Sequence, residues 1–395
     1  MQTPFVQINK RAHKRWKRQH PWIYRSDIQK VEAVSGDIVN VFAPDKRHLG
    51  YAFYSEKSEI SIRRVSRDQE PPNDETWRAR LLQAQARRER LLPAGTSVYR
   101  LIHGEADGFP ATIIDRYGDI FVIQTLCPSS ERLRDLLVEL LKEHFSPRAI
   151  VERNDGKVRD LEGLPRRKGV IYGELPAVME IDVDGLQCSF EPLEGQKTGA
   201  FLDQLTTLRR CMEFVPSSQR VLEACCYQGW FSCHAASRLP DGGSVTAVDI
   251  SKSAIEVLRR NAALNDLSSK ITAIGNNVFE QLRAFDRDNE QFDLIFLDPP
   301  SFIKNRSAKE AGLRGYKELN LRSLRLLPPG GILVSSSCSY HLDRETFWGL
   351  VQEAAADQHM DVQLLDIWGQ GPDHPCMSNF SESDYLKTLV LQRLS

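Results

Sequence analysis

Between Arg220 and Ser336, short apolar segments alternate with longer helix-like segments, and this alternation restricts the fold more than any other feature of the chain. The predicted strands are 221–226, 244–249, 271–274, 292–298 and 331–336, and the predicted helices are 231–239, 253–265 and 308–327. Strands that are apolar along their length and alternate with helices form a parallel sheet covered on both faces. The sequence therefore predicts an α/β fold with a doubly wound, mostly parallel sheet that binds ligands at the carboxyl ends of its strands.

The first predicted strand leads into a turn with a single glycine. The turn reads Cys226-Tyr-Gln-Gly-Trp-Phe-Ser232, and Asp249 closes the next strand 20 residues after Gly229. A carboxylate there can accept hydrogen bonds from both hydroxyls of a ribose. A nicotinamide-dependent oxidoreductase uses the same acid, but it needs a G-x-G-x-x-G pattern to hold a pyrophosphate, and this chain lacks that pattern. We therefore expect S-adenosylmethionine as cofactor, bound by Tyr227, Gly229 and Asp249; an ordinary turn glycine and a surface acid are the alternative.

Two further strand ends carry candidate catalytic residues. Asp298-Pro-Pro-Ser-Phe302 follows the fourth strand, and its prolines fix a backbone suited to binding the polar edge of an extruded nucleobase. Cys338 follows the next strand. A thiolate that adds to carbon 6 of a pyrimidine makes carbon 5 nucleophilic, while Asp298 would stabilise charge at the N3/N4 edge. The alternative role of Cys338 is that of a small buried apolar side chain.

The first 110 residues are basic, whereas the rest of the chain is acidic. They hold 20 Lys and Arg against 13 Asp and Glu, a net charge of +7, so a total of −1 leaves −8 for the remainder. From Lys10 to Tyr24, six cations alternate with aromatic rings, a pattern typical of RNA contacts because cations neutralise phosphates and rings stack on bases. A solvated helix with its rings packed in the core is the alternative. The candidate RNA-binding residues are Lys10, Arg11, Lys14, Arg15, Lys17, Arg18 and Trp22.

Composition assigns the chain to the soluble globular class. No stretch approaches the roughly 18 apolar residues of a membrane span, and Met1–Val6 lacks the features of a secretory signal, so we expect a cytoplasmic protein without membrane contact. Its eight cysteines include no C-x-x-C pair, and in that compartment they stay reduced. We expect neither disulfides nor a bound metal.

A chain of 395 residues is too long for one ordinary core. Short alternating strands up to about residue 70 predict a β-barrel module, and Glu70–Glu75 resembles a linker before an Arg-rich helix at 76–92. We therefore expect three domains: residues 1–72 as an RNA-binding β module, 73–185 as an α+β middle domain, and 186–395 as the catalytic domain.

These motifs together resemble a family of bacterial and archaeal large-subunit ribosomal RNA methyltransferases. Its members join an N-terminal PUA domain, a middle domain and a Rossmann-like class I catalytic domain with a seven-stranded sheet, and many form 5-methylcytosine. The resemblance rests on His20-Pro-Trp-Ile-Tyr24, Leu101-Ile-His-Gly-Glu-Ala-Asp-Gly-Phe-Pro110, Gly195-Gln-Lys-Thr-Gly-Ala-Phe-Leu-Asp-Gln204, Asp298-Pro-Pro, Ser337-Cys-Ser339 and Tyr385-Leu-Lys387. It implies ribosomal RNA as substrate, a homodimer and Cys338 as the methylating nucleophile. It also implies a cofactor pocket that includes Lys197, Thr198, Phe201, Asp203 and Gln204.

The chain departs from the family pattern at three places. Trp230 stands where the family has a glycine, and Glu223 is the acid expected to serve the cofactor at the end of the first strand. Asn277 replaces an aspartate that contacts the adenine amino group, and its amide can still form a hydrogen bond there. Ser301 replaces a lysine in the Asp298 loop, which alters the expected RNA contact.

We interpret the chain as an S-adenosylmethionine-dependent methyltransferase that forms 5-methylcytosine in large-subunit ribosomal RNA. Methylation of a base nitrogen is the nearest alternative, and it would leave Cys338 dispensable because nitrogen attacks directly. A noncatalytic RNA-binding or ribosome-assembly factor is the alternative from a different functional class.

Overall fold

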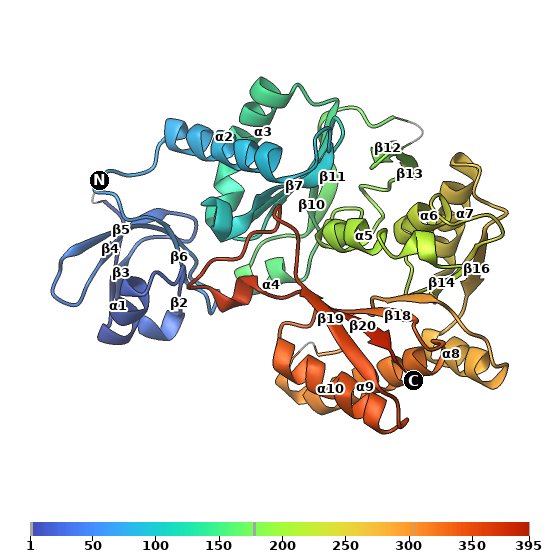
Figure 1. Ribbon diagram of the computed structural model, residues 1–395. Helices are drawn as coiled ribbons and strands as arrows, with labels where there is room; N and C mark the ends of the chain where they lie inside the picture. The colour runs from blue at the N-terminus through green and yellow to red at the C-terminus, as the bar shows by residue number, and fades with distance from the viewer. Residues whose placement is uncertain (1–2, 177–178, 304, 395) are drawn as a thin grey trace. The chain divides into compact units, whose positions relative to one another are not determined.

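The computed structural model describes residues 3–176, 179–303 and 305–394, and it forms two compact units (Figure 1). The first unit comprises Met1–Ile181, Phe190–Leu202 and Pro372–Ser383, and the second comprises Asp182–Ser189, Asp203–Gly371 and Asp384–Ser395. Neither unit is continuous in sequence, and the expected boundaries at 72 and 185 stay predictions. None of the described helices is both long enough and apolar enough to cross a membrane.

The first unit begins with a six-stranded sheet in the order β2-β6-β5-β4-β1-β3. Helix α1 (Lys10–Lys17) starts at Asn9, whose side chain accepts the Ala12 N–H at 2.8 Å. Ala12 and Trp16 are buried in the core of this sheet. This is the small β module predicted at the N-terminus. The strands are β1 (Phe5–Ile8), β2 (Trp22–Ile23), β3 (Ile28–Glu32), β4 (Ile38–Phe42), β5 (His48–Tyr54) and β6 (Ile62–Ser66).

A five-stranded sheet in the order β11-β10-β9-β8-β7 forms the rest of the first unit. Helices α2 (Asp74–Leu91) and α3 (Pro128–Phe145) contribute to the same core as strands β7 to β10. Asn73 and Thr76 form a capping box at the start of α2, which places that start two residues earlier than predicted. The strands and the short helix after β10 are β7 (Val98–His103), β8 (Thr112–Tyr117), β9 (Ile120–Thr125), β10 (Ala149–Asn154), α4 (Val158–Glu162) and β11 (Arg167–Gly173).

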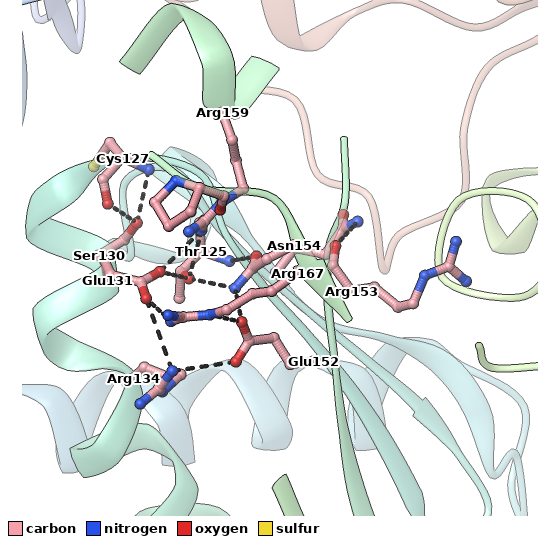
Figure 2. Close-up of polar contacts among 12 residues, drawn as sticks. Thr125, Cys127, Ser130, Glu131, Arg134, Glu152, Arg153, Asn154, Arg159 and Arg167 are labelled. Atoms are coloured by element: carbon pink, nitrogen blue, oxygen red, sulfur yellow. Dashed lines mark hydrogen bonds and ion pairs between the residues drawn. The ribbon is translucent and has the colours of Figure 1, made fainter. Parts of the chain in front are cut away.

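An ionic network joins α3, α4 and the strands β9 to β11 (Figure 2). Arg159 is fully buried and pairs with Glu131 at 2.9 Å, and Arg134 pairs with Glu152 at 3.2 Å. Arg167 contacts both glutamates. Because a buried guanidinium without a partner would cost several kcal/mol, this network fixes the two helices against the sheet.

The second unit contains a seven-stranded sheet in the order β16-β15-β14-β17-β18-β20-β19. The five strands from β16 to β18 are parallel, and β20 is antiparallel to both of its neighbours. The strands are β14 (Arg220–Ala224), β15 (Ser244–Asp249), β16 (Ile271–Gly275), β17 (Leu294–Leu297), β18 (Ile332–Ser337), β19 (Val362–Trp368) and β20 (Lys387–Arg393). A separate two-stranded sheet, β12 (Glu180–Val183) with β13 (Leu186–Ser189), precedes them in the sequence. The strand order reverses between β14 and β17, which is where open α/β sheets bind ligands.

Helices cover both faces of this sheet. Leu222 and Ile295 face a core that includes α8 (Val278–Arg287), α9 (Lys309–Arg325) and α10 (Arg344–Ala356), and α9 lies beside α10 (Figure 1). Successive side chains of a strand point to opposite faces of the sheet. On the other face, Phe296 of β17 stacks on Phe231 of α6 (Trp230–Ala236), and Ala247 of β15 packs on α7 (Lys252–Leu264). The structure therefore has the doubly wound arrangement predicted from the sequence.

Candidate active site

The turn after β14 has an unusual backbone conformation. Cys225, Tyr227 and Gly229 have φ values of 67°, 46° and 71°, all in the left-handed region. A Cβ atom at Gly229 would lie 2.4 Å from the Leu258 side chain, so only glycine fits there. The N–H groups of Cys225 and Cys226 both donate to the carbonyl of Val248, at 2.9 and 3.0 Å, and hold the strained turn against β15.

Asp249 stands at the carboxyl end of β15 and faces this turn. Its Oδ2 atom accepts the N–H of Tyr227 at 2.8 Å, and its Oδ1 atom accepts the N–H of Ser251 at 2.8 Å. Each carboxylate oxygen can accept a second hydrogen bond, and the side chain is only half-buried. An oriented carboxylate with spare acceptor capacity fits the ribose of S-adenosylmethionine.

Glu223 is buried on the same strand as the turn. Its Oε2 atom accepts the N–H of Ser232 at 2.9 Å and also the Ser232 hydroxyl, so the carboxyl group supports the start of α6. The pKa of Glu223 is raised to about 8, chiefly by burial and also by the charges of Asp298 and Asp249, while the hydrogen bonds from Ser232 oppose the shift. The expected contact of Glu223 with a cofactor stays a prediction.

Two other predicted cofactor residues have defined partners in this unit. The Oδ1 atom of Asn277 caps α8 by accepting the N–H of Phe279 at 2.9 Å. The Asp203 carboxylate is buried and accepts the Tyr385 hydroxyl at 2.9 Å. Gln204 follows directly, and its side-chain oxygen is buried without a hydrogen-bond partner among the described residues.

The segment Asp298–Phe302, here called the Asp298 loop, follows β17. The turn at Cys338–Ser339, here called the Cys338 turn, follows the neighbouring strand β18. The Ser339 hydroxyl connects them, since it lies 2.8 Å from the Ser301 hydroxyl and accepts the Ile303 N–H at 3.3 Å. The Tyr316 hydroxyl of α9 lies 2.8 Å from the same Ser339 oxygen. One serine hydroxyl therefore fixes two of the strand ends that were predicted to carry the chemistry.

The remaining predicted cofactor residues belong to the first unit. The Thr198 hydroxyl is buried, donates to Asp115 Oδ2 at 2.6 Å and lies 2.9 Å from the Tyr117 hydroxyl. Lys197 has a φ of 52°, and its ammonium group lies 4.4 Å from the centre of the Phe201 ring. Thr198 therefore anchors this segment to β8.

The predicted RNA-binding helix α1 is amphipathic. Trp16 is buried in the β module, and Trp22 donates its indole N–H to Glu105 at 2.8 Å and packs on Phe380. Arg11 and Arg15 pair with buried Asp27 at 2.6 and 3.5 Å. Four cations are exposed and have no carboxylate within 4.0 Å in the described part of the chain: Lys10, Lys14, Lys17 and Arg18.

Comparison with known proteins assigns the family. A family model described as PUA-like domain matches residues 6–67, and one described as conserved hypothetical protein 95 matches residues 207–318. The ribosomal RNA large subunit methyltransferase I of Shewanella denitrificans is 39% identical over 380 residues, which cover 94% of this chain and 95% of that protein. The enzyme of the same name from Aeromonas salmonicida is 37% identical, with 98% and 99% coverage. The chain belongs to the ribosomal RNA large subunit methyltransferase I family.

Solved structures agree with this fold. The methyltransferase SMU.776 complexed with SAH superposes with a TM-score of 0.83 at 22% identity, covering 98% of this chain and 99% of that one. A SAM-dependent methyltransferase from Streptococcus mutans gives 0.82 at 21% identity, with the same coverage. The expected PUA-like module, the class I methyltransferase fold and, at the level of the family, S-adenosylmethionine as cofactor are confirmed.

Sequence reasoning assigned no role to Ser339, Tyr316 and Lys387, which organise the Cys338 turn in this family member. Lys387 is only 2% exposed and is the first residue of β20, ahead of the buried residues Thr388–Leu391. A lysine at the start of such a strand was the available signal, because a buried ammonium group requires specific partners. No sequence pattern indicates the contacts of the Ser339 hydroxyl with Ser301 and Tyr316, because these residues are 38 and 23 positions away from Ser339.

Proposed function

We propose that this chain is an S-adenosylmethionine-dependent methyltransferase that forms 5-methylcytosine in large-subunit ribosomal RNA, with Cys338 as nucleophile. Family membership supports the RNA substrate. The observation that carries the proposal is the pairing of β17 with β18, because it brings the Cys338 turn beside the Asp298 loop and Ser339 links the two.

S-adenosylmethionine supplies an electrophilic methyl group when it is bound. Asp249, with the left-handed turn at Tyr227 and Gly229, would hold its ribose, and the amide group of Asn277 would donate to an acceptor nitrogen of adenine. The Asn277 oxygen caps α8, and the side chain also carries an NH2 donor, which an aspartate lacks. Lys197, Thr198, Phe201, Asp203, Gln204 and Glu223 are proposed as the further cofactor-pocket residues.

Cys338 is proposed to act on the pyrimidine ring. Its thiolate forms a bond to carbon 6, the electrons of the C5–C6 double bond move toward carbon 5, and Asp298 stabilises the charge at the N3/N4 edge. After carbon 5 has gained the methyl group, loss of its proton restores the double bond and expels the thiolate. The bond between Cys338 sulfur and carbon 6 is thereby broken, and the thiolate is regenerated.

The test is trapping with large-subunit ribosomal RNA that carries fluorine at carbon 5 of its cytosines. Fluorine cannot leave as a proton does, so the sulfur–carbon adduct persists through denaturing electrophoresis. We expect the wild type and the Cys376→Ala control, in which an exposed cysteine is removed, to form the adduct. We expect Cys338→Ala to form none. An adduct with Cys338→Ala would refute the role of Cys338, and methylation at a base nitrogen by that variant would favour the alternative chemistry.

Exposed cations on α1 are proposed as the RNA contact of the β module: Lys10, Lys14, Lys17 and Arg18. Arg11, Arg15 and Trp22, which have partners within the first unit, would brace this face. The homodimer and the cytoplasmic location stay predictions.

A further inference from the structure

Lys387 lies at the edge of the Cys338 turn. It is the first residue of β20 and pairs with Ser337, the last residue of β18, so it stands opposite the position directly before Cys338. Its side chain is buried, with an overall exposure of 2%. Burying an ammonium group costs several kcal/mol unless its surroundings compensate, which indicates a specific role.

The ammonium group binds backbone carbonyls near the turn. Its Nζ atom donates to the carbonyl of Ser339 at 2.7 Å and to that of Tyr385 at 2.7 Å. The first carbonyl belongs to the residue after Cys338, and the second lies in the segment that leads into β20. Lys387 therefore ties the Cys338 turn to the segment that precedes β20 through charge-assisted hydrogen bonds.

Lys387 interacts electrostatically with a thiolate at Cys338. The pKa of Lys387 is lowered to about 8, chiefly by burial and also by Arg344, while the charges of Asp384, Cys338 and Asp343 oppose the shift. An interaction between two charges is reciprocal: if a thiolate at Cys338 favours the ammonium form of Lys387, the ammonium favours the thiolate to the same extent. Tyr316, whose own pKa burial raises, also interacts with the charge of Cys338.

We propose that Lys387 is a positioning residue that holds the Cys338 turn against β20 and stabilises the thiolate form of Cys338. This inference rests on the proposed function for its catalytic meaning. The contact itself exists without RNA or cofactor, so it can be tested separately.

The test is the pH dependence of iodoacetamide alkylation of the full chain, with Cys338 followed by peptide mass spectrometry. We expect Lys387→Met to shift the alkylation midpoint of Cys338 to higher pH and to slow alkylation at pH 7 about tenfold, the effect of roughly one pH unit. Lys317→Met, which removes a lysine paired with Glu353 and Asp357 on the helical face, should leave the midpoint unchanged. An unchanged midpoint in folded Lys387→Met would overturn the inference.

A second measurement covers the case in which Lys387→Met does not fold. In protein labelled with carbon-13 at lysine, NMR titration of the Lys387 side chain should give a lower midpoint in Cys338→Ala than in the wild type. An equal midpoint in the two proteins would also overturn the inference. Retained methylation by Cys338→Ala would instead refute the proposed function and leave the Lys387 contact standing.

Discussion

Gly229 carries two separate constraints at the cofactor turn, a left-handed backbone and close contact with Leu258. Gly242 has a similar φ of 79°, but a Cβ atom there would meet nothing within 4 Å. We expect Gly242→Ala to lower the free energy of unfolding by about 1–2 kcal/mol, the cost of the left-handed conformation alone. Gly229→Ala should cost more and also weaken S-adenosylmethionine binding, as measured by urea unfolding and calorimetry. Equal losses in the two variants would contradict the contact with Leu258.

Glu223 makes the stability of the protein depend on pH. Its pKa is about 8 in the folded protein, above the unfolded value near 4.3, so the folded state holds the extra proton between these values. Its contribution to stability is therefore complete below about pH 4.3 and is lost as pH rises through 8. We expect the free energy of unfolding of the wild type, relative to Glu223→Gln, to fall by up to about 1.4 kcal/mol per pH unit in this window. Parallel profiles for the two proteins in denaturant titrations would contradict the buried, protonated carboxyl group.

At the scale of elements, the connection between the β17 and β18 ends rests on one hydroxyl. Ser339→Ala removes its contacts with Ser301, Tyr316 and the Ile303 N–H, so we expect turnover to fall at least tenfold while the protein remains folded. Ser336→Ala is the matched control, because the Ser336 hydroxyl is also buried but lies 2.7 Å from the Thr388 hydroxyl within the sheet. Each variant should lose about 1 kcal/mol of stability. Full activity in Ser339→Ala would show that the loops keep their positions without this link.

The elements with a strong local pattern were predictable. The helix expected at 253–265 is α7 (Lys252–Leu264), and the helix expected at 308–327 is α9 (Lys309–Arg325). Their apolar spacing depends only on neighbouring residues, and α7 also begins at a capping serine, Ser251, whose hydroxyl accepts the Ala254 N–H. The close packing of α9 against the Asp298 loop was not predicted, although Gly312 permits it: a Cβ atom there would lie 2.4 Å from Ile303.

The candidate site was predictable where it follows strand ends. The structure places Gly229, Asp249, Asp298 and Cys338 at or just after the carboxyl ends of parallel strands, as the sequence predicted, while their roles stay predictions. The local partners of Asn277 and Thr198 were not foreseen, because a side chain that caps a helix or joins a buried network has the same sequence signal as one that binds a ligand. The sequence alone could not distinguish these uses.

At the scale of the whole molecule, segments distant in sequence complete each unit. Pro372–Ser383 returns to the first unit, where the carbonyl of Asp373 accepts from Arg88 at 2.7 Å and its carboxylate accepts the Arg100 N–H at 3.1 Å. These contacts span 285 and 273 residues. No local pattern encodes such a pairing, which is why the sequence suggested contiguous domains.

The uneven charge of the chain predicts how RNA binding responds to salt. Replacing Lys10, Lys14, Lys17 and Arg18 by Gln should weaken binding at every sequence tested and reduce the slope of log affinity against log salt by up to about 3 for single-stranded RNA. Filter binding over a range of salt concentrations measures the slope. A variant in which Arg11 and Arg15, which pair with Asp27, are replaced by Gln should change the slope less for each charge removed. An unchanged slope in the fourfold variant would exclude α1 as the RNA-binding surface.

Cys338 is proposed to activate carbon 5 of a cytosine in large-subunit ribosomal RNA for methylation. This role is tested most directly by mass-spectrometric nucleoside mapping of that RNA from cells that lack this gene and are complemented with wild type or Cys338→Ala. We expect one 5-methylcytosine to disappear without the gene and to return only with the wild type. Loss of a nitrogen-methylated base that Cys338→Ala restores would contradict this role.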